Sequence, residues 1–365
     1  MTAFRAPRIF DGTCWHDDAC LVVEDGRIAA ITRPMAGAVP VSGWIVPGLV
    51  DLQVNGGGGV LLNNDPTPEG IARIQAAHAQ HGTTSLMVTL ITDTAEVTAS
   101  AIKAAAATDV MGLHLEGPHL ALSRKGTHDP ALVRPPQPQD IDVMVAAAAQ
   151  VRLICTLAPE VVAPADIRRL ADAGVTVSLG HSDATFAQAC AAADAGARMV
   201  THVFNAMSQL AHRAPGLVGA ALEDGRLWAG LIADGFHVDD AALRIAMRAK
   251  DGPARLFLVS DAMSTVGTQD DGFMLNGRQI YRKGGRLTLA DGTLAGADIA
   301  LIDAVRHAHA LGVPVEEALR MATAYPAAAM GDATRGGLRV GQRADFLHLS
   351  PDLALRGVWI AGVPA

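Results

Sequence analysis

Eight short apolar runs recur through the middle of this chain, and they constrain its fold more than any other feature. They lie at residues 49–54, 84–90, 110–116, 152–160, 175–181, 198–205, 227–235 and 255–262. Each has the length of a buried strand, and most of the gaps between them hold alanine-rich stretches of helical length. Two of those stretches, 165–174 and 183–196, end in the glycine that often follows a helix.

Eight strands that alternate with helices predict an α/β fold, a (β/α)8 TIM barrel formed by residues 49–334. The alternative is a doubly wound open sheet, which usually carries a GxGxxG phosphate loop after its first strand. The glycines at 56–59 lack that spacing. The alternation is interrupted near 263–295, where we expect a β-hairpin insertion. The terminal segments 1–48 and 335–365 have strand and turn signals but no helical period, so we expect them to pair into one small β-sandwich domain.

Composition excludes several classes of protein. Asp and Glu outnumber Lys and Arg by 37 to 29, for a net charge of −8, which argues against broad binding to nucleic acid or anionic membrane. No apolar run approaches the roughly 18–20 residues that span a bilayer, and the N-terminus does not read as a signal peptide. The four cysteines form no CxxC pair, which is typical of reduced thiols. We expect a cytoplasmic protein.

Polar and ionisable residues fall at the expected carboxyl ends of most of the strands. They are Gln53, Asn55, Thr89, Glu116, Glu160, His181, His202, Asp234, His237 and Asp261. In a barrel, these strand ends line the active site. Burial of ionisable groups is costly unless they are paired or bind a metal, so the pattern predicts a catalytic site.

Glu116, His181 and His202 predict a metal site. One carboxylate and two imidazoles are a typical three-ligand set for Zn²⁺ or a similar ion, with the fourth position open to water. Asp261 is then the expected general base and acid. The alternatives are three satisfied buried side chains and a structural aspartate that caps the following loop.

Three more candidates lie in loops after strands. His128 and His237 can polarise a carbonyl or bind sugar hydroxyls, although exposed loop histidines look the same in sequence. Arg213 follows the sixth strand, and its planar five-donor guanidinium suits a phosphate. Any surface arginine would give the same signal.

Eight sequence words in order resemble the N-acetylglucosamine-6-phosphate deacetylase family of the amidohydrolase superfamily. They are LHLEGPHL (113–120), KGTHDP (125–130), TLAPE (156–160), SLGHSDAT (178–185), THVFNAM (201–207), HRAPGLVGA (212–220), IADGFHVD (232–239) and VSDAM (259–263). The resemblance implies hydrolysis of N-acetyl-D-glucosamine 6-phosphate to D-glucosamine 6-phosphate and acetate. It also implies a homodimer, in which the partner subunit can complete the phosphate site.

The resemblance also implies a role for individual residues. It makes Glu116, His181 and His202 the metal ligands, Asp261 the catalytic aspartate and His128 the group that polarises the carbonyl. The implied substrate-binding residues are Thr127, His128, Asn205, Ala206, Arg213, His237, Leu294, Ala295 and Gly296, with Arg213 on the phosphate.

The chain departs from the wider superfamily at Gln53-Val54-Asn55, where many members have His-x-His and bind two metals. Amides are poor ligands beside softer choices, so we expect one divalent metal per subunit, with Zn²⁺ favoured over Fe²⁺ or Mn²⁺. The first alternative is an enzyme for the N-acetylgalactosamine epimer. A barrel isomerase would need a second proton-transfer group, for which only Glu160 is available. A cyclic-amide hydrolase would need the missing His-x-His and a lysine, and a metal-free binding protein would gain nothing from the buried ionisable set.

Overall fold

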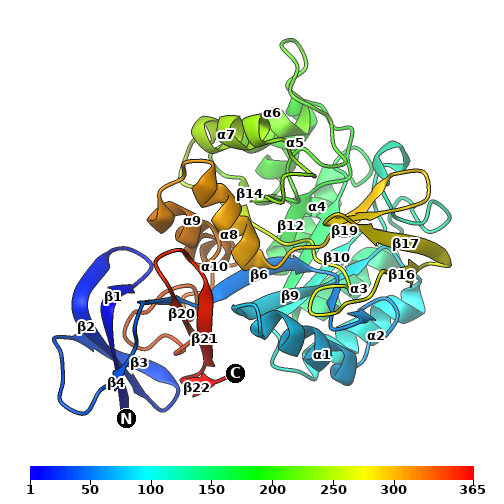
Figure 1. Cartoon of the computed structure of the whole chain (residues 1–365). Helices are drawn as coiled ribbons and strands as arrows, with labels where there is room; N and C mark the ends of the chain where they lie inside the picture. The colour runs from blue at the N-terminus through cyan, green and yellow to red at the C-terminus, as the bar shows by residue number, and fades with distance from the viewer.

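The computed structural model describes residues 1–365, and a barrel of eight parallel strands forms its centre (Figure 1). The strands neighbour one another in chain order: β6 (Leu49–Val54), β9 (Thr83–Ile91), β10 (Gly112–Glu116), β11 (Leu153–Leu157), β12 (Thr176–Leu179), β13 (Met199–Val200), β14 (Trp228–Leu231) and β15 (Leu256–Leu258). The segment after β15 closes the barrel, because the Asp261 N–H donates to the Gln53 carbonyl at 3.0 Å and the Asn55 N–H to the Ala262 carbonyl at 2.9 Å. The predicted barrel is confirmed, and each predicted run overlaps one strand.

Helices cover the outside of the barrel. They are α1 (Pro68–Ala79), α2 (Ala95–Ala106), α3 (Pro138–Ala148), α4 (Pro164–Asp172), α5 (Phe186–Asp194), α6 (Gly216–Glu223), α7 (Asp240–Ala249), α8 (Leu301–Ala310), α9 (Val315–Met321) and α10 (Ala324–Ala329), with a short 3-10 helix η1 (Leu122–Arg124). Local sequence sets several starts: Thr67, Thr94 and Thr185 accept backbone N–H bonds as N-caps. Because helices cover the strands, a core of 78 buried residues joins the two layers. None of the helices has both the length and the apolar character needed to cross a membrane.

Both chain ends contribute to one sheet beside the barrel. It contains β1 (Thr2–Phe10), β2 (Trp15–Glu24), β3 (Arg27–Thr32), β4 (Val39–Pro40), β5 (Trp44–Pro47), β20 (Phe346–Leu349), β21 (Leu355–Ile360) and β22 (Val363–Pro364). Strand β20 pairs antiparallel with β5 and so joins the two ends. The sheet packs around its own core of twelve buried residues. We propose the division of the chain into residues 1–48 with 335–365, and residues 49–334, on this arrangement.

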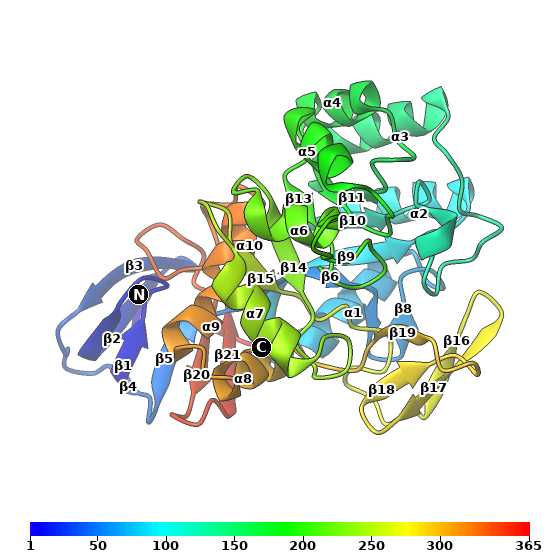
Figure 2. The same cartoon turned by 90° about the horizontal axis from the view of Figure 1, so that it is seen from above.

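The insertion after β15 is larger than the predicted hairpin. The short strands β7 (Gly56–Gly57) and β8 (Val60–Leu61) pair near the start of the barrel, whereas β16 (Gly272–Leu275), β17 (Arg278–Lys283), β18 (Arg286–Thr288) and β19 (Leu294–Ala297) form a four-stranded antiparallel sheet. Figure 2 shows this sheet and the terminal sheet on opposite sides of the barrel. The Ala297 N–H donates to the Asp261 carbonyl at 2.9 Å, which places β19 beside the end of the last barrel strand.

Candidate active site

A cavity of about 510 Å³ lies at the carboxyl ends of the barrel strands. Most of the predicted site residues line it: Glu116, Thr127, His128, His181, His202, Asn205, Ala206, His237, Asp261, Leu294 and Gly296. Ala295 is fully buried between two of them. This volume lies within the ~300–1,000 Å³ that small-molecule sites usually occupy.

Three ionisable residues of the cavity have unusual backbone conformations. His181, His202 and Asp261 have φ angles of 47°, 29° and 51°. The left-handed region is uncommon for residues other than glycine, and such strain tends to gather at functional sites. Each of these residues comes just after a strand ends, so the sharp turn directs the side chain into the cavity.

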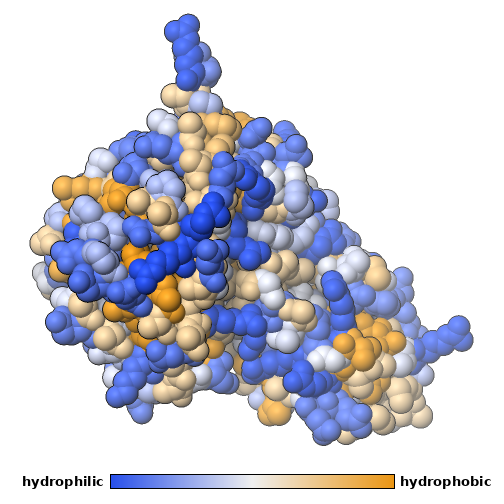
Figure 3. All heavy atoms as spheres, turned by 180° about the vertical axis from the view of Figure 1, so that it is seen from behind, coloured by the Kyte–Doolittle hydropathy of each residue, from blue (hydrophilic) through white to orange (hydrophobic).

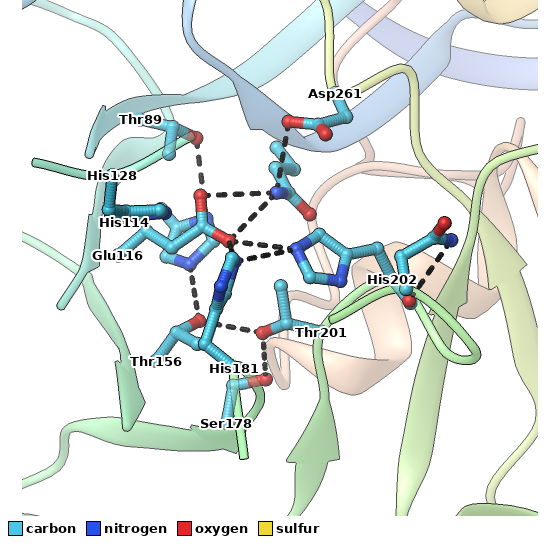
Figure 4. A network of polar contacts seen from close by, with 12 residues as sticks. Thr89, His114, Glu116, His128, Thr156, Ser178, His181, Thr201, His202 and Asp261 are labelled. Atoms are coloured by element: carbon cyan, nitrogen blue, oxygen red, sulfur yellow. Dashed lines mark hydrogen bonds and ion pairs between the residues drawn. The ribbon is translucent and has the colours of Figure 1, made fainter. Parts of the chain in front are cut away.

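Glu116, His181 and His202 converge on one point (Figure 4). Glu116 Oε1 lies 3.1 Å from His181 Nε2 and 3.0 Å from His202 Nε2, and the two nitrogens are 3.2 Å apart. All three side chains are buried. Three potential ligand atoms therefore meet inside the protein, supplied by strand β10 and by the turns after β12 and β13.

The protonation of His181 indicates that a cation belongs among these atoms. His181 Nδ1 lies 2.7 Å from the Arg124 carbonyl, which only accepts hydrogen bonds, so Nδ1 carries the proton. In the neutral ring, the lone pair of Nε2 then faces the Glu116 carboxylate and a nitrogen of His202. Such an arrangement is unfavourable unless a positive charge lies between the groups. The donor set, two imidazole nitrogens and a carboxylate oxygen, fits a divalent ion such as Zn²⁺.

The pKa shifts at the site reflect the same need for positive charge. Burial alone would raise the pKa of Glu116, but the His181 and His202 rings hold it well below its usual range. Burial opposes the charged form of His202, yet Glu116 outweighs that effect and raises the pKa of the ring. A proton or a metal ion would satisfy this carboxylate, so metal binding should compete with protons.

Asp261 lies next to this cluster and is held by two amides. Asn55 Nδ2 donates to Asp261 Oδ1 at 2.7 Å, and Gln53 Nε2 donates to the same oxygen at 3.1 Å. Gln53 Nε2 also reaches both oxygens of Glu116, at 3.3 and 3.4 Å. Burial, followed by the negative charge of Glu116, raises the pKa of Asp261 to about 6. The amide group of Gln53 therefore joins two carboxylates as a hydrogen-bond donor.

Two histidines on other sides of the cavity are oriented by neighbours. His237 Nδ1 lies 2.6 Å from Asp234 Oδ2, and Asp234 Oδ1 accepts the His237 backbone N–H. Burial favours the neutral form of Asp234, but the hydrogen bond from His237 outweighs burial and lowers the pKa of this carboxyl. His128 Nδ1 faces Thr92, and burial, followed by the nearby His181, lowers the pKa of His128 to about 3. Both rings therefore have Nε2 free for the cavity.

Arg213 lies away from the cavity. Residues 211–214 are all exposed, and Ala211 and Ala214 pair in a tight turn. Figure 1 shows the segment between β13 and α6 standing out from the body of the molecule, and Figure 3 shows that its tip is hydrophilic. The guanidinium therefore does not reach the site of its own chain.

Of the residues expected at the strand ends, Gln53, Thr89, Glu160 and Asp234 do not line the cavity, and several lining residues were missed. Thr89 lies inside the barrel against His114, and Glu160 binds the Ser182 hydroxyl and the Asp183 N–H instead of lining the cavity. The missed lining residues are Ile91, Ser123, Arg124, Gly126, Met263, Gly292 and Thr293. Ser123 and Arg124 immediately precede the KGTHDP word, which was the available signal.

Comparison with known proteins finds similar chains of about the same length and the same fold. Residues 44–364 match the model of the amidohydrolase family. The chain is 40% identical to the N-acetylgalactosamine-6-phosphate deacetylase of Shewanella sp. (strain ANA-3), over 88% of this chain and 83% of that protein. It is 33% identical to the N-acetylglucosamine-6-phosphate deacetylase of Vibrio furnissii, over 98% and 94%. The crystal structure of N-acetylglucosamine-6-phosphate deacetylase from Pasteurella multocida superposes with a TM-score of 0.94 at 31% identity, covering 100% of this chain and 99% of that one.

Proposed function

This chain belongs to the amidohydrolase family, and from that premise we propose that it removes the acetyl group of N-acetyl-D-glucosamine 6-phosphate. The products are D-glucosamine 6-phosphate and acetate. The observation that carries this proposal is the convergence of Glu116 Oε1, His181 Nε2 and His202 Nε2 within 3.2 Å, beside Asp261 in a cavity of about 510 Å³. The named activities of the similar proteins support the same reaction.

The family implies a divalent metal, and the buried Glu116, His181 and His202 would hold it. A divalent ion at such a site lowers the pKa of a bound water and polarises the substrate carbonyl. We propose one ion per subunit, with Zn²⁺ favoured by the imidazole and carboxylate donors and Fe²⁺ or Mn²⁺ as alternatives. Support for a single ion comes from Gln53, whose amide nitrogen is already directed at the carboxylates of Glu116 and Asp261.

Asp261 moves the proton in the proposed reaction. Its carboxylate accepts the proton of the attacking water and then passes it to the amide nitrogen as the C–N bond breaks. The Asn55 and Gln53 amides fix the Oδ1 atom, so Oδ2 is left for this transfer. A raised pKa suits both duties, because the group must take up a proton and release it in one turnover.

The remaining side chains hold the substrate. His128 donates from Nε2 to the acetyl carbonyl and stabilises the negative charge that develops there. Thr127, Asn205, Ala206, His237 and the 294–296 segment bind the sugar and its phosphate. Thr127 Oγ1 supports this assignment, since it is buried and has no partner within the chain.

We propose that the enzyme is a cytoplasmic homodimer in which Arg213 binds the phosphate in the partner's cavity. Arg213 lies on an exposed turn outside its own cavity, and Leu210 nearby keeps 55% of its surface exposed. An exposed leucine next to an unpaired arginine suits a protein contact. The four free cysteines agree with a reducing compartment.

The test is acetate release by the purified, metal-loaded protein, with N-acetylglucosamine 6-phosphate and its galacto epimer offered in parallel. We expect faster release from the gluco substrate. The galacto epimer is the second candidate, because the Shewanella relative at 40% identity carries that name. A preference for the galacto epimer would change the substrate and keep the mechanism. No release from either substrate would overturn the proposal.

A further inference from the structure

His128 makes a close contact that the proposed reaction does not by itself require. His128 Nδ1 lies 2.8 Å from Thr92 Oγ1, and the Thr92 backbone N–H donates to the same nitrogen at 3.3 Å. Both residues are 2% exposed. Thr92 is the first residue after strand β9, and His128 lies in the loop after β10. Two neighbouring strand ends thus meet at one ring nitrogen.

The direction of these bonds determines the protonation of the His128 ring. A backbone N–H can only donate, so Nδ1 is an acceptor and carries no proton. The ring is therefore neutral, with its proton on Nε2. If Nδ1 carried the proton, two hydrogens would face each other across the 3.3 Å contact and the buried Thr92 N–H would lose its acceptor.

Thr92 is itself fixed in place by the strand that carries Glu116. The Thr92 hydroxyl has one proton, and two acceptors share it: His128 Nδ1 at 2.8 Å and the Glu116 carbonyl oxygen at 3.2 Å, with the shorter contact taking the larger share. The next residue, Gly117, has a φ of +90°, and a Cβ atom there would lie 2.2 Å from Thr92 Oγ1. Only glycine leaves room for this hydroxyl, so the Glu116-Gly117 pair provides both a ligand candidate and the space for Thr92.

The opposite edge of the His128 ring, which carries Nε2, lies toward the cavity. His128 lines the cavity, and one of its ring nitrogens lies within 4.8 Å of donor atoms of Glu116 and His181. Nε2 makes no hydrogen bond within the chain, and it is not among the buried atoms that lack a partner. An Nε2–H group there is a free donor, whereas an unprotonated Nε2 would repel a carbonyl oxygen.

We propose that Thr92 is a positioning residue, which holds His128 as the Nε2–H tautomer and so directs a hydrogen-bond donor at the substrate carbonyl. Thr92 does not line the cavity and acts through His128. This inference rests on the proposed function for its consequence in catalysis, and on the contacts of Thr92 for the tautomer itself.

The direct test is NMR of the metal-loaded protein with ¹⁵N-labelled histidine. The spectrum of the His128→Gln variant identifies the His128 signals among those of the 13 histidines. We expect the wild type to have only the Nε2–H tautomer at His128. Thr92→Val keeps the backbone bond at 3.3 Å but loses the shorter hydroxyl bond at 2.8 Å, so the Nδ1 signal should move and a fraction of the Nδ1–H tautomer should appear beside the Nε2–H form. Thr92→Ser should restore the wild-type signal. A proton on Nδ1 in the wild type, or an unchanged ring in Thr92→Val, would overturn the inference.

Kinetics supply the second readout, as a double-mutant cycle. Thr92→Val should lower kcat roughly 10- to 100-fold with little change in KM, as is typical when the partner that orients a site residue is lost. In the His128→Gln background, the same change should cost nothing more, because the residues act as a unit. An equal loss in both backgrounds would mean that Thr92 acts through another group, such as the Glu116 carbonyl.

Thr83→Val is the matched control. Thr83 begins the same strand, is 2% exposed, and has a hydroxyl with no partner, so its loss should leave kcat and the His128 signals unchanged. The two proposals can fail separately. Absence of acetate release would overturn the proposed function but not the tautomer, whereas rapid release from a protein with His128 protonated at Nδ1 would overturn only the role of Thr92.

Discussion

At the scale of single residues, the site depends on a few side chains placed just beyond strand ends. His181, His202 and Asp261 all adopt positive φ angles, which cost about 1–3 kcal/mol each for residues other than glycine. This strain accompanies sharp turns of the chain, which bring the three side chains together inside the barrel. The Gln53 amide contacts both carboxylates, but Asp261 has the Asn55 amide as its second partner, whereas Glu116 has two imidazoles.

Replacement of Asp261 by Asn should separate metal binding from proton transfer. The Asp261→Asn side chain cannot accept and return the proton, so kcat should fall by about 10²–10⁴-fold, while Glu116, His181 and His202 still hold one metal. Metal content and acetate release are measured on the same sample. Asp271→Asn, an exposed carboxyl on the loop after the same strand, is the control. Wild-type turnover in Asp261→Asn would exclude this residue as the base.

The predictability of the site differed from residue to residue for a physical reason. Glu116, His181, His202 and Asp261 can be identified from the sequence because an ionisable residue directly after an apolar strand is rare. The sequence words that resemble the family point to the same four residues. Threonine carries no such signal, since it is common in strands. The sequence predicts a strand end at Thr89, whereas the strand continues to Ile91. Thr89 lies in the barrel interior against His114, and Thr92 holds the position at the rim.

At the scale of elements, helix α1 packs on the glycine-rich β7–β8 pair through His78. Its Nε2–H donates to the Gly56 carbonyl at 2.9 Å, and the side chain is fully buried. A Cβ atom at Gly57 would lie 2.9 Å from His78 Cδ2. The glycines at 56–57 therefore allow the helix to approach closely. This contact accounts for part of the glycine run at 56–59, which lacks the spacing of a phosphate-binding loop.

His78 should make stability depend on pH. Burial lowers its pKa from 6.5 to about 4, so the unfolded chain binds a proton first as pH falls. The contribution of neutral, buried His78 to the free energy of unfolding is complete above pH 6.5. It is lost as the pH falls from about 6.5 to 4, and the total loss is about 3 kcal/mol. Denaturant unfolding of the wild type and His78→Gln at several pH values should show their difference shrinking over that window. A difference that stays constant with pH would contradict this account, and the exposed His309→Gln is the control.

At the scale of the whole molecule, two additional sheets lie beside the barrel. The insertion sheet places residues 294–296 against Asp261 through β19, and the terminal sheet joins both chain ends. The hairpin predicted from the sequence underestimated the insertion because its short, polar strands give weak alternation. The sequence predicts that the two terminal segments pair, because both have strand and turn signals. It does not predict that β5 pairs with β20, since register depends on contacts between distant residues.

The protruding turn with Arg213 gives a prediction about assembly. Arg213→Gln should raise KM with little change in kcat, because the lost charge binds the phosphate and not the reacting bond. If Arg213 serves the partner, co-expression of Arg213→Gln and Asp261→Asn chains should restore activity. A hybrid dimer would have one cavity with an intact Asp261 and an intact Arg213 from its partner. Absence of any gain over the two separate variants would place Arg213 outside the partner's site.

The central claim is that Glu116, His181 and His202 hold a single catalytic metal ion. The most direct measurement is acetate release from N-acetylglucosamine 6-phosphate while Zn²⁺ is added stepwise to metal-free protein. We expect activity to rise linearly and stop at one equivalent per chain, with no such rise in Glu116→Gln. A plateau that needs two equivalents, or full activity without metal, would contradict the account.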